Sequence, residues 1–209
     1  ARSVQSATTA YNLRNRTSER ERYFIKSYYE INVKGNLEAA LQTCELWAQT
    51  YPREALPNGF LAAMIYPVFG KYEEGAEAAR KAIGINPGFA IAYYQLSFNS
   101  QYLNRLEDAG TILDRATERK LDIPEFLLER YDIAFVKGDK PGMERAATLG
   151  STKPGVADLL ADRQGFVLAY SGQRKQAEAM VRRASGLNPQ PSQAGKRALF
   201  EIGPALWEA

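Results

Sequence analysis

Small and apolar residues recur along the chain at the three- and four-residue intervals of an α-helix. Four segments show this spacing most clearly. Their recurring positions are Ala40, Cys44 and Trp47; Ala79 and Ala82; Ala109, Leu113 and Ala116; and Ala177, Val181 and Ala184. Such a stripe is typical of a helix that packs one face against its neighbours. The pattern therefore predicts a series of packed helices.

Turn signals precede these helices at nearly constant spacing. The turns begin at Gly35, Gly70, Asn104, Gly138 and Gly172, which are 35, 34, 34 and 34 residues apart. Gly and Asn suit a backbone position that needs a positive φ. Three of the helices should also stop before a proline, because the residue before proline disfavours the α region. These stops are Tyr51-Pro52, Asn86-Pro87 and Asn188-Pro189.

The repeated unit resembles the tetratricopeptide repeat (TPR) family, whose unit is a helix-turn-helix of 34 residues. Gly-Lys-Tyr-Glu-Glu at residues 70–74 and Ala-Ile-Gly-Ile-Asn-Pro at 82–87 are similar to the family's second helix, and residues 90–96 resemble its first. The resemblance implies an all-α, right-handed superhelix of about five repeats with flanking helices. The expected repeats are 21–55, 56–89, 90–123, 124–157 and 158–191.

Four positions depart from the family pattern, which favours small residues there. Gly75 stands where the family has Ala, and Trp47 fills another small-residue position. The fourth repeat carries Met143 and Gly150 at its small positions, so its packing is expected to be the least regular.

The two ends extend the helical pattern. Ala7, Ala10 and Leu13 predict a helix over residues 3–16, within a segment 1–20 that resembles part of a preceding or capping repeat. Ser18-Glu19-Arg20-Glu21 fits the capping box that begins a helix. Residues 192–209 predict another helix, disturbed at Gly203-Pro204, as part of a truncated further repeat. We expect the chain to be a fragment of a longer protein.

Residues 13–22 and 45–52 are also similar to TPR regions of bacterial serine/threonine protein kinases and transcriptional regulators. The chain itself contains no His-Arg-Asp loop, no Asp-Phe-Gly and no glycine-rich nucleotide loop. The resemblance therefore implies a non-catalytic region of a larger regulatory or signalling protein.

Composition narrows the chemistry further. The 209 residues include no histidine and one cysteine, which excludes Ser-His-Asp and Cys-His catalysis, histidine-ligated metals and an internal disulfide. A net charge of +3 gives no indication of nucleic acid binding. The longest apolar stretch, residues 60–69, is far shorter than the roughly 20 residues of a membrane span. We expect the chain to have no enzymatic activity, to bind no cofactor or metal and not to insert into a membrane. We further expect a soluble domain of unknown location, either cytoplasmic or the exported part of a membrane-anchored parent.

The TPR resemblance implies a concave groove lined by the first helix of each repeat. Carried over by spacing, the candidates are Lys26, Tyr29, Phe60, Leu61, Met64, Tyr94, Phe98, Tyr102, Glu129, Asp132, Asp162, Arg163, Phe166 and Tyr170. Aromatic and Met side chains suit apolar anchors of a peptide, and the carboxylates suit a basic end. The alternative for each aromatic residue is ordinary packing between repeats. Some TPR domains bind a terminal carboxylate with Lys, Asn and Arg side chains on successive first helices. That clamp is absent here, since the corresponding places hold Ile25, Tyr29, Leu61, Ile91 and Gln95.

A second function fits the same pattern. Open ends of a helical solenoid expose apolar surface, so the chain is alternatively an assembly element that self-associates, for example as a homodimer.

The remaining signals favour structural roles. Cys44 lies on a packing stripe and reads as a buried hydrophobe. Glu73-Glu74 and Glu107-Asp108 follow turns, where acids favour a helix N-terminus. Asp158 and Asp162 are too few ligands to indicate a cation site. The arginines interleaved with Glu19 and Glu21 indicate a salt-bridged surface rather than a phosphate site; they are Arg14, Arg16, Arg20 and Arg22.

Overall fold

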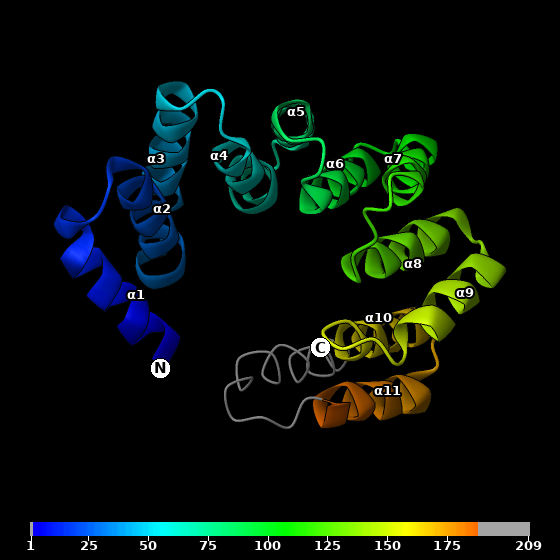
Figure 1. The fold of residues 1–209 in the computed structure, drawn as a ribbon. Helices are drawn as coiled ribbons and strands as arrows, with labels where there is room; N and C mark the ends of the chain where they lie inside the picture. Colours follow the sequence, from blue (N-terminus) through cyan, green and yellow to red (C-terminus); the bar gives the residue numbers. More distant parts are fainter. Residues whose placement is uncertain (1, 188–209) are drawn as a thin grey trace. The chain divides into compact units, whose positions relative to one another are not determined.

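The computed structural model describes residues 2–187, and within that range all regular structure is helical (Figure 1). The all-α prediction is confirmed. The helices are α1 (Arg2–Leu13), α2 (Glu19–Tyr29), α3 (Leu37–Thr50), α4 (Ala55–Phe60), α5 (Tyr72–Ile85), α6 (Ala90–Tyr102), α7 (Leu106–Glu118), α8 (Glu125–Lys137), α9 (Lys140–Gly150), α10 (Ala157–Tyr170) and α11 (Arg174–Leu187). Short turns of other helical types are η1 (Arg14–Arg16), η2 (Glu30–Lys34), η3 (Leu61–Ile65) and η4 (Tyr66–Phe69).

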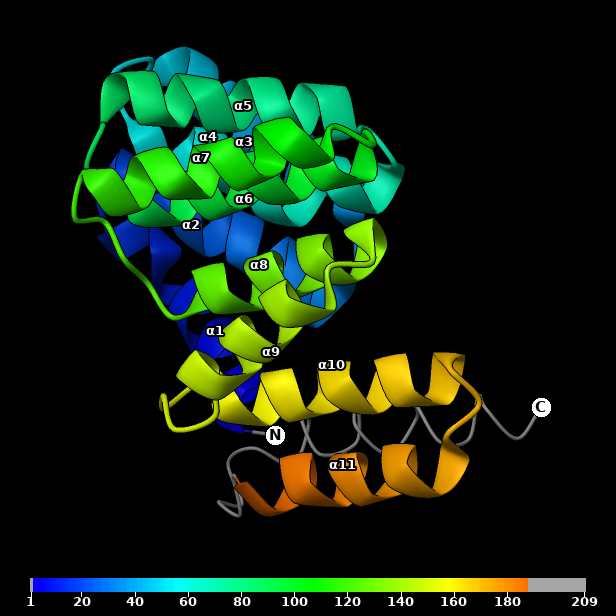
Figure 2. The same cartoon turned by 90° about the vertical axis from the view of Figure 1, so that its right-hand side faces the viewer.

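The chain forms two compact units, Ala1–Leu121 and Asp122–Ala209. In the first unit, each helix packs against the next along the chain, from α1 through α7. Figure 2 shows α5, α6 and α7 side by side with nearly parallel axes. In the second unit, α8 packs on α9, α10 packs on α11, and α8 also contacts α10. Consecutive helices joined by short turns are therefore the basic element of both units.

The five predicted turn residues all have the left-handed backbone that Gly and Asn tolerate. Their φ angles lie between 60° and 75°. In four turns the second residue donates its N–H to a carbonyl five residues earlier, at 2.8–2.9 Å, as in a Schellman C-cap. These four bonds are Lys71 N–H to Tyr66 O, Arg105 N–H to Ser100 O, Asp139 N–H to Ala134 O and Gln173 N–H to Leu168 O. The same local turn geometry therefore reverses the chain direction at these four positions.

The first helix of the second predicted repeat is irregular around Pro67. Proline has no N–H to donate, and its ring crowds the preceding turn. The helix passes into a π turn at η3, where the Tyr66 N–H bonds to Leu61 O, and then into the 3₁₀ turn η4. A π turn takes one residue more than an α turn. The only 35-residue interval between predicted turns, from Gly35 to Gly70, contains η3.

The predicted helix boundaries hold at several places. Residues 3–16 are helical as α1 and η1, and both hydrogen bonds of the capping box join Ser18 and Glu21. The helices α3 and α5 end immediately before Tyr51-Pro52 and Asn86-Pro87. The predicted stop at Asn188-Pro189 and the predicted helix 192–209 lie outside the described residues.

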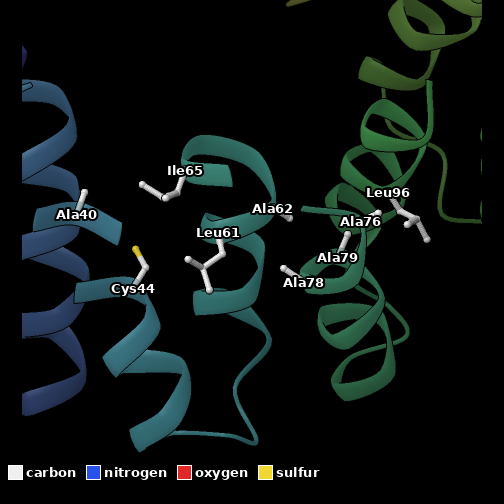
Figure 3. Packing of buried hydrophobic residues seen from close by; sticks show 9 residues of the cluster. All are labelled: Ala40, Cys44, Leu61, Ala62, Ile65, Ala76, Ala78, Ala79 and Leu96. Atoms are coloured by element: carbon white, nitrogen blue, oxygen red, sulfur yellow. The ribbon is translucent and has the colours of Figure 1, made fainter. Parts of the chain in front are cut away.

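A hydrophobic core of the first unit lies between α3, η3, α5 and α6 (Figure 3). Its buried members are Ala40, Cys44, Leu61, Ala62, Ile65, Ala76, Ala78, Ala79 and Leu96. Three residues of the predicted stripes, Ala40, Cys44 and Ala79, belong to it. Leu61, which the groove prediction includes, lies in this core instead and is 4% exposed.

Two departures from the family pattern have direct packing reasons. A Cβ at Gly75 would lie 2.2 Å from the Oδ1 of Asn99, whose side chain is fully buried. A Cβ at Gly150 would lie 2.7 Å from Leu160 Cδ2, at the contact between α9 and α10. Both glycines are therefore fixed by a large neighbour. The buried Trp47 donates its Nε1–H to Glu54 Oε2 at 3.2 Å, so its polar atom is satisfied.

Candidate peptide-docking surface

A row of aromatic side chains runs along α6. Tyr94, Phe98 and Tyr102 are spaced four residues apart, which places them on one face of the helix. The ring centroids are 6.3 Å apart between Tyr94 and Phe98, and 4.7 Å apart between Phe98 and Tyr102. Tyr102 stacks on Tyr72 of α5 at 4.7 Å and remains 55% exposed. These three predicted groove residues, called the α6 row below, form one continuous and partly exposed aromatic surface.

A second aromatic group joins α2, α3 and α4. Phe24 packs edge-on against Phe60 with ring centroids 5.6 Å apart, and the Phe60 ring lies beside the buried Trp47 ring with centroids 6.1 Å apart. Phe24 is 40% exposed, whereas Phe60 is half-buried. Phe60 was predicted for the groove, but much of its surface serves contacts within the first unit. Phe24 was not predicted as a groove residue, although it lies four residues before Tyr28, a spacing that places both rings on one face of α2.

The remaining groove candidates of the first unit have mixed surroundings. Tyr29 stacks on Tyr11 of α1 with ring centroids 4.0 Å apart. Lys26 is exposed, and Met64 is half-buried. Tyr29 therefore holds α1 against the rest of the unit in addition to any contact with a ligand.

In the second unit, the predicted carboxylates are not equally accessible. Glu129 is buried. Asp132 accepts a hydrogen bond from Arg163 Nε at 2.9 Å, so these two candidates pair with each other. Burial raises the pKa of Asp132 and the pKa of Asp162, and the nearby Arg163 opposes both shifts. Asp162 is half-buried and is the predicted carboxylate best placed to meet a cation of a ligand.

The same unit carries two exposed aromatic candidates on α10. Phe166 is 52% exposed and Tyr170 is 77% exposed. They lie one helical turn apart, and the Tyr170 ring packs edge-on against Phe135 of α8 at 5.6 Å. Each unit thus presents an exposed aromatic surface on a helix that the family resemblance makes a first helix.

The Cys44 side chain is buried, as predicted. Its Sγ donates to Ser27 Oγ at 3.3 Å. Burial raises the pKa of the Cys44 thiol to about 11, so the thiol is neutral at physiological pH and unsuited to nucleophilic attack.

Two charge predictions need correction in detail. Of the arginines near the N-terminus, Arg20 forms an ion pair, and its partner is Glu54 at 2.7 Å rather than a sequence neighbour. Glu21 belongs to the capping box and Glu19 accepts from the Tyr51 hydroxyl. Glu73 does more than favour a helix N-terminus, because both of its oxygens accept from Arg105, at 2.8 and 3.2 Å. Sequence proximity could not reveal the partners Glu54, Tyr51 and Arg105, since each lies more than 30 residues from the residue that it contacts.

Residues 2–187 contain no group of three or more His, Cys, Asp or Glu side chains arranged to hold a metal ion. Asp158 is buried, and its Oδ1 accepts the N–H of Leu159 at 3.0 Å. None of the helices in this range has both the length and the apolar content that a bilayer span requires.

One feature of the first unit had no sequence signal. Four arginines from α5, α7 and the turn before α7 line a cavity together with apolar side chains. Consecutive members lie 25, 10 and 4 residues apart along the chain, and only the tertiary packing brings Arg80 of α5 beside the other three.

No protein-family model matches this chain, and a search of curated proteins finds no relative either.

Proposed function

We propose that this chain is a non-enzymatic TPR-like solenoid that binds a peptide or protein segment as part of a larger regulatory protein. The proposed fold is a right-handed superhelix of about five helix-turn-helix repeats. Five left-handed turns at 34- and 35-residue intervals support it, since a repeated turn between packed helices is how such solenoids propagate.

The observation that carries the proposed function is the α6 row. Partly exposed aromatic side chains in a line provide a large contact area and lose little rotamer entropy when they bind. Intervals of four residues also match the spacing of apolar anchors on a helical ligand. An apolar peptide segment is therefore the ligand that this surface suits best.

The acidic part of the ligand hypothesis rests mainly on Asp162. Glu129 is buried and Asp132 is paired with Arg163, so neither offers an uncompensated exposed charge. A basic residue next to the apolar anchors remains part of the proposal, with Asp162 as its expected partner.

The test uses a peptide selected from a random library against the whole chain, with affinity measured by calorimetry. The paired substitutions Phe98→Ala and Tyr102→Ala should weaken binding about tenfold or more, equivalent to about 1.4 kcal/mol. Leu149→Ala on α9 is the control, because Leu149 is also apolar and 60% exposed but lies on a second helix. It should leave the affinity unchanged.

The conservative variant Tyr102→Phe keeps the ring and should retain most of the binding. Circular dichroism and thermal unfolding establish that each variant is folded. Equal affinities for the wild type and the Phe98→Ala, Tyr102→Ala variant would contradict the proposal. Mass measured by light scattering across concentrations distinguishes the self-association alternative, which requires a concentration-dependent dimer.

A further inference from the structure

A cavity of about 400 Å³ lies between α5, α6 and α7 of the first unit. Tyr93 and Leu96 of α6 line it, whereas the adjacent Tyr94 belongs to the α6 row. Successive residues of an α-helix point about 100° apart, so the cavity and the row occupy different faces of α6. The cavity is therefore separate from the proposed peptide-docking surface.

Part of the cavity lining, called the floor below, is apolar. It is formed by Ile83, Leu96 and Ile112, one from each of the three helices. The polar atoms beside the floor are already engaged within the protein. The Tyr93 hydroxyl donates to Pro87 O at 3.1 Å, and the Ser100 hydroxyl donates to Leu96 O at 2.7 Å. A ligand would meet hydrocarbon there.

The lining also carries four guanidinium groups and the carboxylate of Asp108, and the guanidinium groups differ in how far their charge is compensated. Arg105 is held by both oxygens of Glu73, and Asp108 lies close enough to raise the pKa of Arg105 further. Arg80 shares an exposed contact of 3.4 Å with Glu77.

Arg115 and Arg119 are the uncompensated pair. Within the described part of the chain, neither forms an ion pair. They are four residues apart at the C-terminal end of α7 and its cap, so both project from the same face of the helix. Two guanidinium groups in this relation present several N–H donors to one anion.

Guanidinium forks match the oxygens of carboxylate and phosphate groups, and cavities of about 300–1,000 Å³ are typical of small-molecule sites. We propose that this cavity binds a small organic anion with an apolar body. Its acid group lies on Arg115 and Arg119, and its hydrocarbon part lies on Ile83, Leu96 and Ile112. The charges of Arg115 and Arg119 disfavour a cation, and a small mineral anion has no apolar part to bury against the three aliphatic side chains.

The test titrates the whole chain with 1-anilinonaphthalene-8-sulfonate, which joins an aromatic body to one negative charge and fluoresces in apolar sites. The paired variant Arg115→Gln, Arg119→Gln should weaken its binding at least tenfold. The control variant Arg182→Gln, Arg183→Gln removes the same charge from exposed positions of α11 and should bind as the wild type does. Equal binding by the two variants would overturn the proposal.

Three competitors separate the two parts of the ligand. Decanoate should displace the dye, whereas acetate lacks the apolar body and decanol lacks the charge, so both should displace it poorly. Displacement by acetate at the same concentration as decanoate would overturn the apolar part, and displacement by decanol as well as by decanoate would overturn the role of the arginines.

A second variant keeps all four arginines and tests whether the dye occupies this cavity. Thr111 is exposed on α7 and lines the cavity, so Thr111→Trp places an indole in the mouth. This variant should lose dye binding while its circular dichroism spectrum and melting temperature stay close to the wild type. Undiminished dye binding by the folded Thr111→Trp protein would overturn the proposed location.

Discussion

At the scale of single residues, two buried positions explain why this chain departs from a simple repeat of small side chains. Asn99 is fully buried and uses its Nδ2 to donate to Ala62 O at 3.1 Å and to Gln95 O at 2.7 Å. The first of these bonds ties α6 to the π turn η3. Gly75 leaves the room that the Asn99 side chain needs. The buried Asn99 and the absence of a side chain at Gly75 are therefore parts of one contact.

Gly75→Ala should destabilise the protein by about 1–3 kcal/mol, because the new methyl group overpacks the site against Asn99. Gly84→Ala is the matched control in the same helix. Nothing lies within 4 Å of a Cβ at Gly84, so alanine there should stabilise α5 by up to about 1 kcal/mol through helix propensity. Urea unfolding followed by circular dichroism measures both changes. A Gly75→Ala protein as stable as the wild type would contradict this account of the packing.

At the scale of elements, one more helix end adopts the geometry of the predicted turns although its residue is neither Gly nor Asn. After α7, Lys120 has a φ of 62°, and Leu121 donates its N–H to Ala116 O at 3.0 Å. This is the same five-residue bond that closes four of the predicted turns. The sequence did not mark this turn, since lysine carries no preference for a left-handed backbone.

Lys120→Gly should stabilise the protein by up to about 1 kcal/mol, because glycine relieves the steric cost of a side chain at positive φ. Lys120→Ala is the control: it removes the same long side chain and charge but keeps the Cβ, so it should give no such gain. Thermal unfolding of the two variants side by side separates the backbone effect from the loss of charge. Equal melting temperatures would show that φ at residue 120 is not strained.

At the scale of the whole molecule, contacts are made mainly between helices that are close in sequence, and they group into two compact units. In proteins built this way, stability is nearly a sum of local and nearest-neighbour contributions, and parts of the chain open separately. Destabilisation should therefore stay largely within the unit in which it is introduced.

Leu160→Ala tests this expectation. Leu160 is 1% exposed and belongs to the core of the second unit with Leu127, Leu128 and Val156. Its truncation should cost about 2–5 kcal/mol locally. Hydrogen exchange should then accelerate in residues 122–187 far more than in residues 2–121. The reciprocal variant Leu113→Ala, equally buried in α7, should give the opposite pattern. Uniform acceleration over both units would contradict the expectation.

The sequence by itself determined the helices and the points at which they reverse. Glycine, asparagine and proline act through the backbone of their own turn, so Gly35, Asn104 and Pro52 could be interpreted without knowing what surrounds them. The small residues at helical spacing likewise identified core positions such as Ala40 and Ala79, because helix geometry alone decides which side chains share a face.

Tertiary structure alone decided which side chains remain accessible and which charges are compensated. Leu61, predicted for the groove, lies in the core, and Asp132 pairs with Arg163, which is 31 residues away in the sequence. Arg80 of α5 likewise reaches the cavity arginines of α7 and its caps only through the packing of the two helices. Exposure and pairing depend on distances between elements, and those distances are set by how whole helices pack, which no local pattern specifies.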